Sequence, residues 1–128
     1  MYENPEHTAE QRTPAWVDIY NQFTDKVMDW AGLENLQKYL WQRQLHIYEV
    51  PFYYIEYGIA QLGAIGVWKN YRENPEKGLK GYLDALKMGY TAPITEIYQA
   101  ANIPFDFSKN YITELMQFVQ SELERLKI

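Results

Sequence analysis

The sequence contains no cysteine, which excludes disulfide bonds and metal sites built on thiolates. Only two histidines are present, His7 and His46, and the motifs H-E-x-x-H, G-x-S-x-G, G-x-G-x-x-G and the P-loop are all missing. We therefore predict that this chain builds no zinc site of its own and is not an enzyme complete in itself. A chain without cysteine is compatible with a reducing compartment, and we expect a cytoplasmic location.

Clusters of basic residues are also missing. The net charge is −5, and Lys and Arg are not gathered in one stretch, so binding of nucleic acid is not expected. The first twelve residues are polar, which argues against a signal peptide. The longest apolar stretch, residues 50–68, contains Glu56, Gln61 and three glycines. Because a charge near the centre of a bilayer is costly, we predict no insertion into a membrane.

Aromatic residues, by contrast, are plentiful. They make up 16% of the 128 residues, with twelve tyrosines and four tryptophans, which predicts an aromatic-rich core or an aromatic-lined groove. The hydrophobic share of 47% and the charged share of 23% are typical of a globular chain. Since the length also fits one domain, we predict a single helical domain over residues 1–128.

The apolar residues recur at helical spacing, and no strand pattern competes with them. The sequence therefore predicts an all-α fold of about six helices. Helix 51–71 is apolar almost all round, which predicts that the other helices surround it. The expected starts rest on caps followed by proline, as at Thr13-Pro14 and Asn74-Pro75, and Ser108 is the expected cap of the last helix. The expected helices cover residues 14–31, 33–45, 51–71, 75–88, 93–102 and 109–126, each to within a few residues.

The candidate functional residues are His46 and the tyrosines that follow it. If Pro51 begins a helix, Tyr53 and Tyr57 are four apart and Tyr54 and Tyr57 are three apart, so their hydroxyls point to one side. Such a set could donate hydrogen bonds to a developing oxyanion. The alternative is that the tyrosines pack and each hydroxyl finds a local partner, with His46 a satisfied core histidine. Spacing alone favours this packing role.

Glu56 falls between the tyrosines and has two interpretations. It could be an exposed carboxylate in the first turn of a helix, where the helix dipole favours negative charge. It could instead line a substrate groove. The sequence alone favours the first interpretation.

The stretch WQRQLHIYEVPFYYIEYGIAQLGAIGVW, residues 41–68, closely resembles the C-terminal part of oligoendopeptidase F-type zinc metallopeptidases, which are related to thimet oligopeptidase. The similarity runs from MYENPEHTAEQR through NPEKGLKGYLDALKMGYT to AANIPFDFS. The resemblance implies an all-α fold with a channel that admits short peptides. It also implies a zinc ion held by H-E-x-x-H and a later glutamate, with the motif glutamate as general base.

The resemblance further assigns roles to residues of this chain. His46 matches a histidine that helps to bind substrate and stabilise the tetrahedral intermediate. Tyr54 and Tyr57 match the tyrosines that act with it, with Tyr53 as the alternative. Tyr53 and Glu56 are the candidates for substrate binding, Glu56 because of its position among the tyrosines and not because of the resemblance. The zinc motif and the general base are absent, so the resemblance implies a C-terminal fragment whose zinc belongs to the full-length family.

Two further expectations follow. A fragment of a larger helical body leaves apolar surface uncovered, so we expect the chain to form homo-oligomers. We expect no peptidase activity from the chain alone, and short peptides as substrates in the full-length context. The alternative function is a non-catalytic helical module, a truncated paralogue that binds a peptide or a protein partner.

Overall fold

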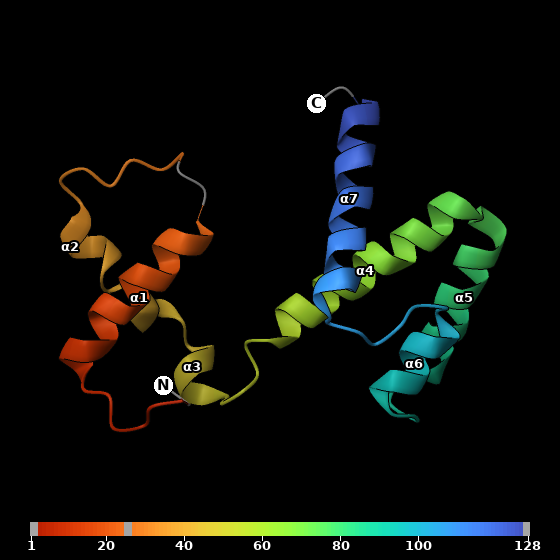
Figure 1. The fold of residues 1–128 in the computed structure, drawn as a ribbon. Helices are drawn as coiled ribbons and strands as arrows, with labels where there is room; N and C mark the ends of the chain where they lie inside the picture. Colours follow the sequence, from red (N-terminus) through yellow and green to blue (C-terminus); the bar gives the residue numbers. More distant parts are fainter. Residues whose placement is uncertain (1–2, 25–26, 127–128) are drawn as a thin grey trace. The chain divides into compact units, whose positions relative to one another are not determined.

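A computed structural model describes residues 3–24 and 27–126, and within these all regular secondary structure is helical, with no strand. The all-α prediction is confirmed (Figure 1). No helix in the described ranges is long and apolar enough to cross a membrane. The elements are α1 (Ala9–Phe23), α2 (Glu34–Gln37), the 3₁₀ helix η1 (Leu40–Arg43), α3 (His46–Glu49), α4 (Glu56–Glu73), α5 (Pro75–Met88), α6 (Ile94–Ala100) and α7 (Lys109–Leu126).

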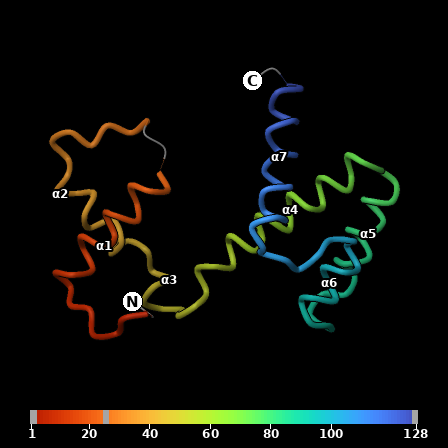
Figure 2. The backbone as a smooth tube through the Cα atoms, in the orientation of Figure 1, coloured from red at the N-terminus to blue at the C-terminus, as the bar shows by residue number. Residues whose placement is uncertain are grey.

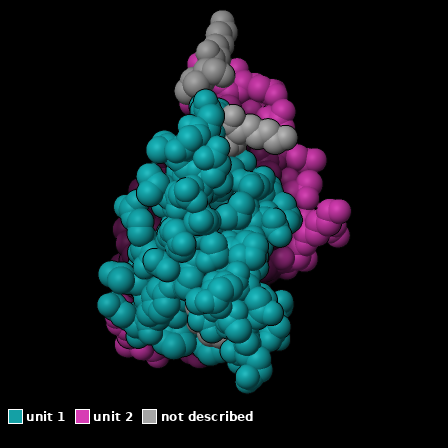
Figure 3. All heavy atoms as spheres, turned by 90° about the vertical axis from the view of Figure 1, so that its left-hand side faces the viewer, with its two compact units in different colours: residues 1–54 teal, residues 55–128 magenta. Residues whose placement is uncertain are grey.

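The chain divides into two compact units, coloured separately in Figure 3. Unit 1 is Met1–Tyr54 and unit 2 is Ile55–Ile128. Each unit is described by itself below. The single domain over residues 1–128 stays a prediction.

The first helix of unit 1 begins at Ala9, so the predicted start at Pro14 is wrong. The hydroxyl of Thr8 accepts a hydrogen bond from the Gln11 backbone N–H at 3.4 Å. The Gln11 side chain in turn accepts one from the Thr8 N–H at 2.9 Å. This reciprocal capping box satisfies two backbone donors and starts the helix early, with Pro14 inside it. The helix ends at Phe23, so the predicted end at residue 31 is also wrong, and residues 25–26 of the expected first helix lie outside the described residues.

The predicted helix over 33–45 is wrong as a continuous element. It is divided into α2 and η1, because Tyr39 between them has φ −104° and ψ 2°, outside the helical region. Two side chains of this segment are buried. Gln37 donates from its amide to the Asn21 side chain of α1 at 2.9 Å, and the Trp41 ring lies 6.0 Å from that of Tyr48.

In unit 2, both α5 and α7 pack against α4, and α6 packs against α5 (Figure 2). The core gathers Ala85, Ala101 and Ile103, with Leu115 of α7 buried separately. Helix α4 thus carries α5 and α7, whereas α6 packs on α5. The burial of α4 is limited to Gly63, Ile65 and Gly66, so the other helices do not surround it as predicted.

The caps of α5 and α7 confirm the predictions for these helices. The Asn74 side chain accepts a backbone N–H at 3.0 Å, and Pro75 is the first helical residue of α5. Gly89 ends the helix with φ 53°, a conformation that favours glycine. The Ser108 hydroxyl accepts the Tyr111 N–H at 3.3 Å at the start of α7. A helix cap depends on residues that are close in the sequence, so the sequence alone was sufficient to predict these helix ends.

A side-chain amide joins α4 to the end of α6. The Asn70 amide nitrogen donates to the carbonyl oxygens of Ala101 at 3.3 Å and Asn102 at 2.8 Å. Asn102 has φ 59°, so the chain turns sharply where α6 ends. The Asn70 contact therefore holds two backbone carbonyls beyond the last turn of α6.

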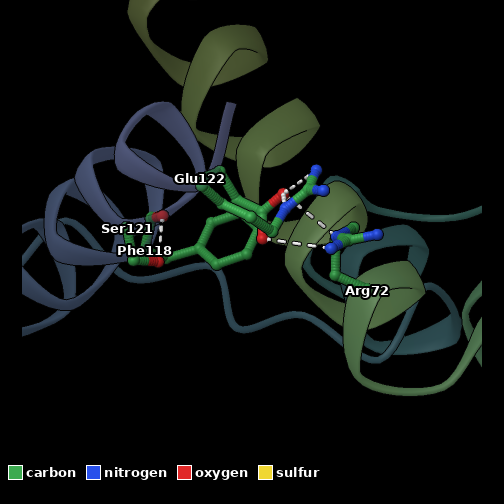
Figure 4. Close-up of polar contacts among 5 residues, drawn as sticks. Arg72, Phe118, Ser121 and Glu122 are labelled. Atoms are coloured by element: carbon green, nitrogen blue, oxygen red, sulfur yellow. Dashed lines mark hydrogen bonds and ion pairs between the residues drawn. The ribbon is translucent and has the colours of Figure 1, made fainter. Parts of the chain in front are cut away.

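A carboxylate on α7 is held by two arginines (Figure 4). Glu122 is only 8% exposed, and its oxygens lie 3.1 Å from Arg72 Nε of α4 and 3.0 Å from Arg125 Nη2. Burial would raise the pKa of Glu122. The hydrogen bonds and charges of Arg125, and then of Arg72, outweigh this, so the pKa lies below its ordinary value. The carboxylate therefore stays ionised and links α7 to α4.

Acid should weaken this link. The pKa of Glu122 is lower in the folded chain than the ordinary value of 4.5. The ionised carboxylate therefore stabilises the fold fully above pH 4.5, and this stabilisation is lost as the pH falls through the lowered pKa. We expect Glu122→Gln to destabilise unit 2 near neutral pH and to reduce the loss of stability between neutral pH and about pH 3. Urea unfolding followed by circular dichroism measures both effects.

The matched control is Glu96→Gln, which changes an exposed carboxylate on α6 for which the described residues offer no ion pair. If the control changed the pH dependence as much as Glu122→Gln, the ion pairs of Glu122 with the two arginines would not be its cause.

Candidate functional site

Two tyrosine rings stack on the imidazole of His46. The ring centroids of His46 and Tyr53 are 5.6 Å apart with 9° between the planes. Those of His46 and Tyr54 are also 5.6 Å apart, with 23° between the planes. All three residues belong to unit 1, and His46 begins α3. The structure thus brings three of the five sequence-predicted site residues together.

A tight turn produces this stack. The Tyr53 N–H donates to the Val50 carbonyl oxygen at 3.1 Å, which places Pro51 and Phe52 at the two central positions of the turn. Phe52 has φ 64°, the sign that a type II turn requires at its third residue. The chain therefore reverses between α3 and the tyrosines. For a bulky residue such a φ is uncommon and is a form of backbone strain found at functional sites.

The same turn shows that the predicted helix start at Pro51 is wrong. A residue with positive φ cannot continue a right-handed helix, and α4 begins only at Glu56. Tyr53 and Tyr54 precede the helix, so the helical spacing on which their common orientation was predicted does not apply to them. The stack with His46 is made by the turn instead.

The other two candidates, Glu56 and Tyr57, lie in the first turn of α4, in unit 2. Tyr57 is 56% exposed. Glu56 is exposed and stands where the helix dipole favours a carboxylate. Its charge also acts on Tyr98, whose pKa is raised first by burial and then by Glu56. The Tyr98 hydroxyl donates to the Ile59 carbonyl oxygen at 3.0 Å.

A cavity of about 530 Å³ lies beside Tyr54, within unit 1. The Tyr54 hydroxyl donates to Gln44 Oε1 at 2.9 Å, and both side chains line the cavity. This cavity could not be predicted from the sequence, because its walls come from segments that are distant in the chain. The one available signal was the aromatic pair Trp16 and Tyr20, four apart in the predicted first helix. The lining residues are Trp16, Tyr20, Leu40, Arg43, Gln44 and Tyr54.

A larger cavity, of about 670 Å³, lies within unit 2. Its walls come from α4, α5 and α6, and they are mostly aliphatic or aromatic, with Leu79 and Ile97 among them. No charged side chain lines it. It therefore has the character of an apolar packing surface and offers little to orient a polar substrate.

The described ranges, 3–24 and 27–126, offer no metal site. No group of three or more His, Cys, Asp or Glu side chains gathers in them in a way that could hold a metal ion. The polar groups that the site does offer are an imidazole, phenol hydroxyls, an amide and a guanidinium. The amide oxygen already accepts a hydrogen bond from the Tyr54 hydroxyl. The groups that the site offers are therefore mainly hydrogen-bond donors, which suit an anionic or carbonyl oxygen of a ligand.

The chain matches a known protein family. No curated protein and no solved structure matches the chain. The family model described as Peptidase family M3 matches residues 1–117. This match takes in nearly the whole chain, including the His46 stack and α4. The chain therefore belongs to peptidase family M3.

Proposed function

We propose that this chain is the C-terminal, substrate-binding and transition-state-stabilising part of a cytoplasmic zinc metalloendopeptidase of the oligoendopeptidase F type. Membership of peptidase family M3, which is zinc-dependent and acts on peptides, supports a role in peptide hydrolysis. The observation that carries the proposal is the stack of His46 with Tyr53 and Tyr54. It is formed by the residues that resemble the substrate-binding histidine and tyrosines of the oligoendopeptidases.

The zinc of the family does not fit the residues described here. No group of possible ligands gathers among them, so no step of the reaction is assigned to zinc on this chain. The proposal therefore concerns only what the chain's own side chains do to a bound peptide. We expect the chain alone to hydrolyse no peptide.

The chemistry of these side chains is hydrogen-bond donation. When a peptide carbonyl is attacked, negative charge develops on its oxygen, and donors aimed at that oxygen stabilise the transition state more than the substrate. The imidazole N–H of His46 and the Tyr57 hydroxyl are donors of this kind. The Tyr54 hydroxyl, which donates to Gln44 Oε1, becomes one when it turns from that oxygen to the substrate. Stacking against two phenol rings restricts the rotation of the imidazole, so its donor is held ready for the reaction.

The tyrosine hydroxyls can be tested one at a time. In the peptidase that contains this chain, we expect Tyr54→Phe and Tyr57→Phe each to lower kcat about tenfold or more while KM changes little, because the lost bond forms in the transition state. Steady-state kinetics with a short fluorogenic peptide measures both constants.

The matched control is Tyr53→Phe, which keeps the ring stacked on His46 and removes only a hydroxyl. A fall in kcat for Tyr53→Phe alone would transfer the donor role to that residue. Unchanged kcat in both Tyr54→Phe and Tyr57→Phe would contradict the proposed role of the two tyrosines.

The cavity beside Tyr54 also supports an alternative function. Its aromatic and polar lining would also suit a non-catalytic module that holds a peptide or a partner segment. The genomic reading frame that precedes the first codon separates the two functions. An H-E-x-x-H motif in frame supports the peptidase, and a stop codon supports the binding module.

We also expect the chain to associate with itself. Leu79 and Leu86 of α5 are about half exposed and line the apolar cavity of unit 2, a surface that a second copy could cover. Sedimentation velocity should show a dimer or a larger species, and Leu86→Glu should shift the chain toward monomer. Lys77→Glu, an exposed change on the same helix, is the control. A clean monomer at high concentration would contradict this expectation.

A further inference from the structure

The cavity beside Tyr54 contains one cation without a described counter-ion. Arg43 ends η1, its side chain lines the cavity, and the residue is exposed. Within residues 3–24 and 27–126 no carboxylate forms an ion pair with it, and no Asp or Glu lines the cavity. A guanidinium donates five N–H groups and accepts none. This wall of the cavity therefore favours a ligand with negatively charged oxygens.

Gln44 strengthens the same preference. Its amide oxygen is already the acceptor of the Tyr54 hydroxyl, at 2.9 Å. That hydrogen bond places the amide nitrogen as the part of the side chain that offers donors to a ligand. One guanidinium beside one amide suits a planar carboxylate, which accepts two parallel hydrogen bonds. The same pair supplies less positive charge than the residues of a phosphate site normally do.

Other residues that line the cavity are largely apolar. Trp16 and Tyr20 lie one turn apart on α1, with ring centroids at 5.9 Å and 32° between the planes, and Leu40 completes the lining. Two aromatic rings and a leucine offer contact area to an aromatic or branched aliphatic side chain. A volume of about 530 Å³ lies within the range of known small-ligand pockets.

We propose that this cavity binds the C-terminal residue of a peptide. The free α-carboxylate accepts hydrogen bonds from Arg43 and Gln44, and the side chain of that residue packs against Trp16, Tyr20 and Leu40. The inference rests on the proposed function for its choice of a peptide as the ligand. Because Tyr54 contacts both the cavity and His46, a peptide anchored here would reach the candidate site within unit 1. Arg43 would then determine specificity for free C-termini.

Binding to the 128-residue chain tests the inference without any need for catalysis. The probes are the tripeptide Ala-Ala-Phe and its C-terminal amide, which differ only in the charge that Arg43 is proposed to recognise. Calorimetry gives the Kd, and tryptophan fluorescence reports contact with the wall at Trp16. We expect the free acid to bind about tenfold more tightly than the amide, and Arg43→Gln to remove that difference.

The matched control is Lys38→Gln, which removes one positive charge from the same unit at a residue that does not line the cavity. It should leave the tenfold preference intact. If Arg43→Gln lost its helical circular dichroism, Arg43→Lys would replace it. Arg43→Lys keeps the charge and loses the two-pronged geometry, so the preference should shrink.

Equal affinity for the acid and the amide would overturn the carboxylate anchor and leave peptide binding in place. A preference that survives both Arg43 variants would overturn the role of Arg43. Failure of both peptides to bind would overturn the inference altogether. The kinetics of the tyrosine variants judge the proposed function separately, so the two can fail independently.

Discussion

The substitution Gly78→Ala, which adds one methyl group, should destabilise unit 2 by about 2 kcal/mol or more. A loss of this size is typical of substitutions that overpack a core. Gly78 is buried on α5, and a Cβ atom there would lie 2.6 Å from both Cα and N of Tyr71 and 2.9 Å from C of Asn70. These are backbone atoms of α4, which cannot rotate aside as a side chain can. Helix propensity alone would favour alanine by about 1 kcal/mol, but the clash is the larger effect.

The control for this prediction is the same substitution at Gly58. That residue is exposed on α4, and a Cβ atom there would meet nothing within 4 Å. Gly58→Ala should therefore stabilise the helix by up to about 1 kcal/mol. Urea unfolding of both variants measures the difference, which we expect to have opposite signs. Shifts of the same sign and size would show that α4 and α5 do not approach as closely as the structure has them.

Loss of the His46 imidazole should have the largest effect on catalysis. In the full-length peptidase proposed above, His46→Ala should lower kcat about 100- to 1000-fold, the cost of losing one oxyanion donor in other enzymes. KM should change much less, since the hydrogen bond is proposed to strengthen in the transition state. Single-turnover kinetics with a short peptide separates this loss from effects on product release.

Two further variants separate donation from stacking. His46→Phe keeps an aromatic ring against Tyr53 and Tyr54 but has no donor, so its kcat should be as low as that of His46→Ala. His7→Ala changes the chain's other histidine and should leave kcat unchanged. Near-normal activity of His46→Phe would mean that stacking, and not hydrogen bonding, is what the imidazole supplies.

The sequence predicted some parts of the fold well and others poorly, for physical reasons. The ends of α5 were predictable because an asparagine cap, a proline and a terminal glycine act on their own neighbours. The start of α1 was mispredicted because proline after threonine is a strong helix signal, and the capping box of Thr8 lies just before it. Both signals are local, and the sequence alone does not show which of the two starts the helix.

The candidate site is built differently from the prediction. The rings of His46, Tyr53 and Tyr54 lie together, but through the turn at Phe52 and not through a helix, and the catalytic and binding roles of these residues stay a prediction. Pro51 is a common second residue of such a turn, but phenylalanine at the third position has little tendency to adopt a positive φ, so the sequence favoured a helix start at Pro51 instead. The cavity was missed for a different reason. It brings α1 together with η1, and contacts between segments far apart in the chain leave no periodic signal.

The Asn70 amide also bears on how unit 2 opens. It holds the carbonyls of Ala101 and Asn102, more than thirty residues further along the chain. Helix α6 is short, and a helix of this length has little stability in isolation. Its amide protons should therefore exchange with solvent only when the Asn70 contact breaks, which couples the opening of α6 to that of α4. Helices α4, α5 and α6 would then behave as one cooperative unit in hydrogen exchange.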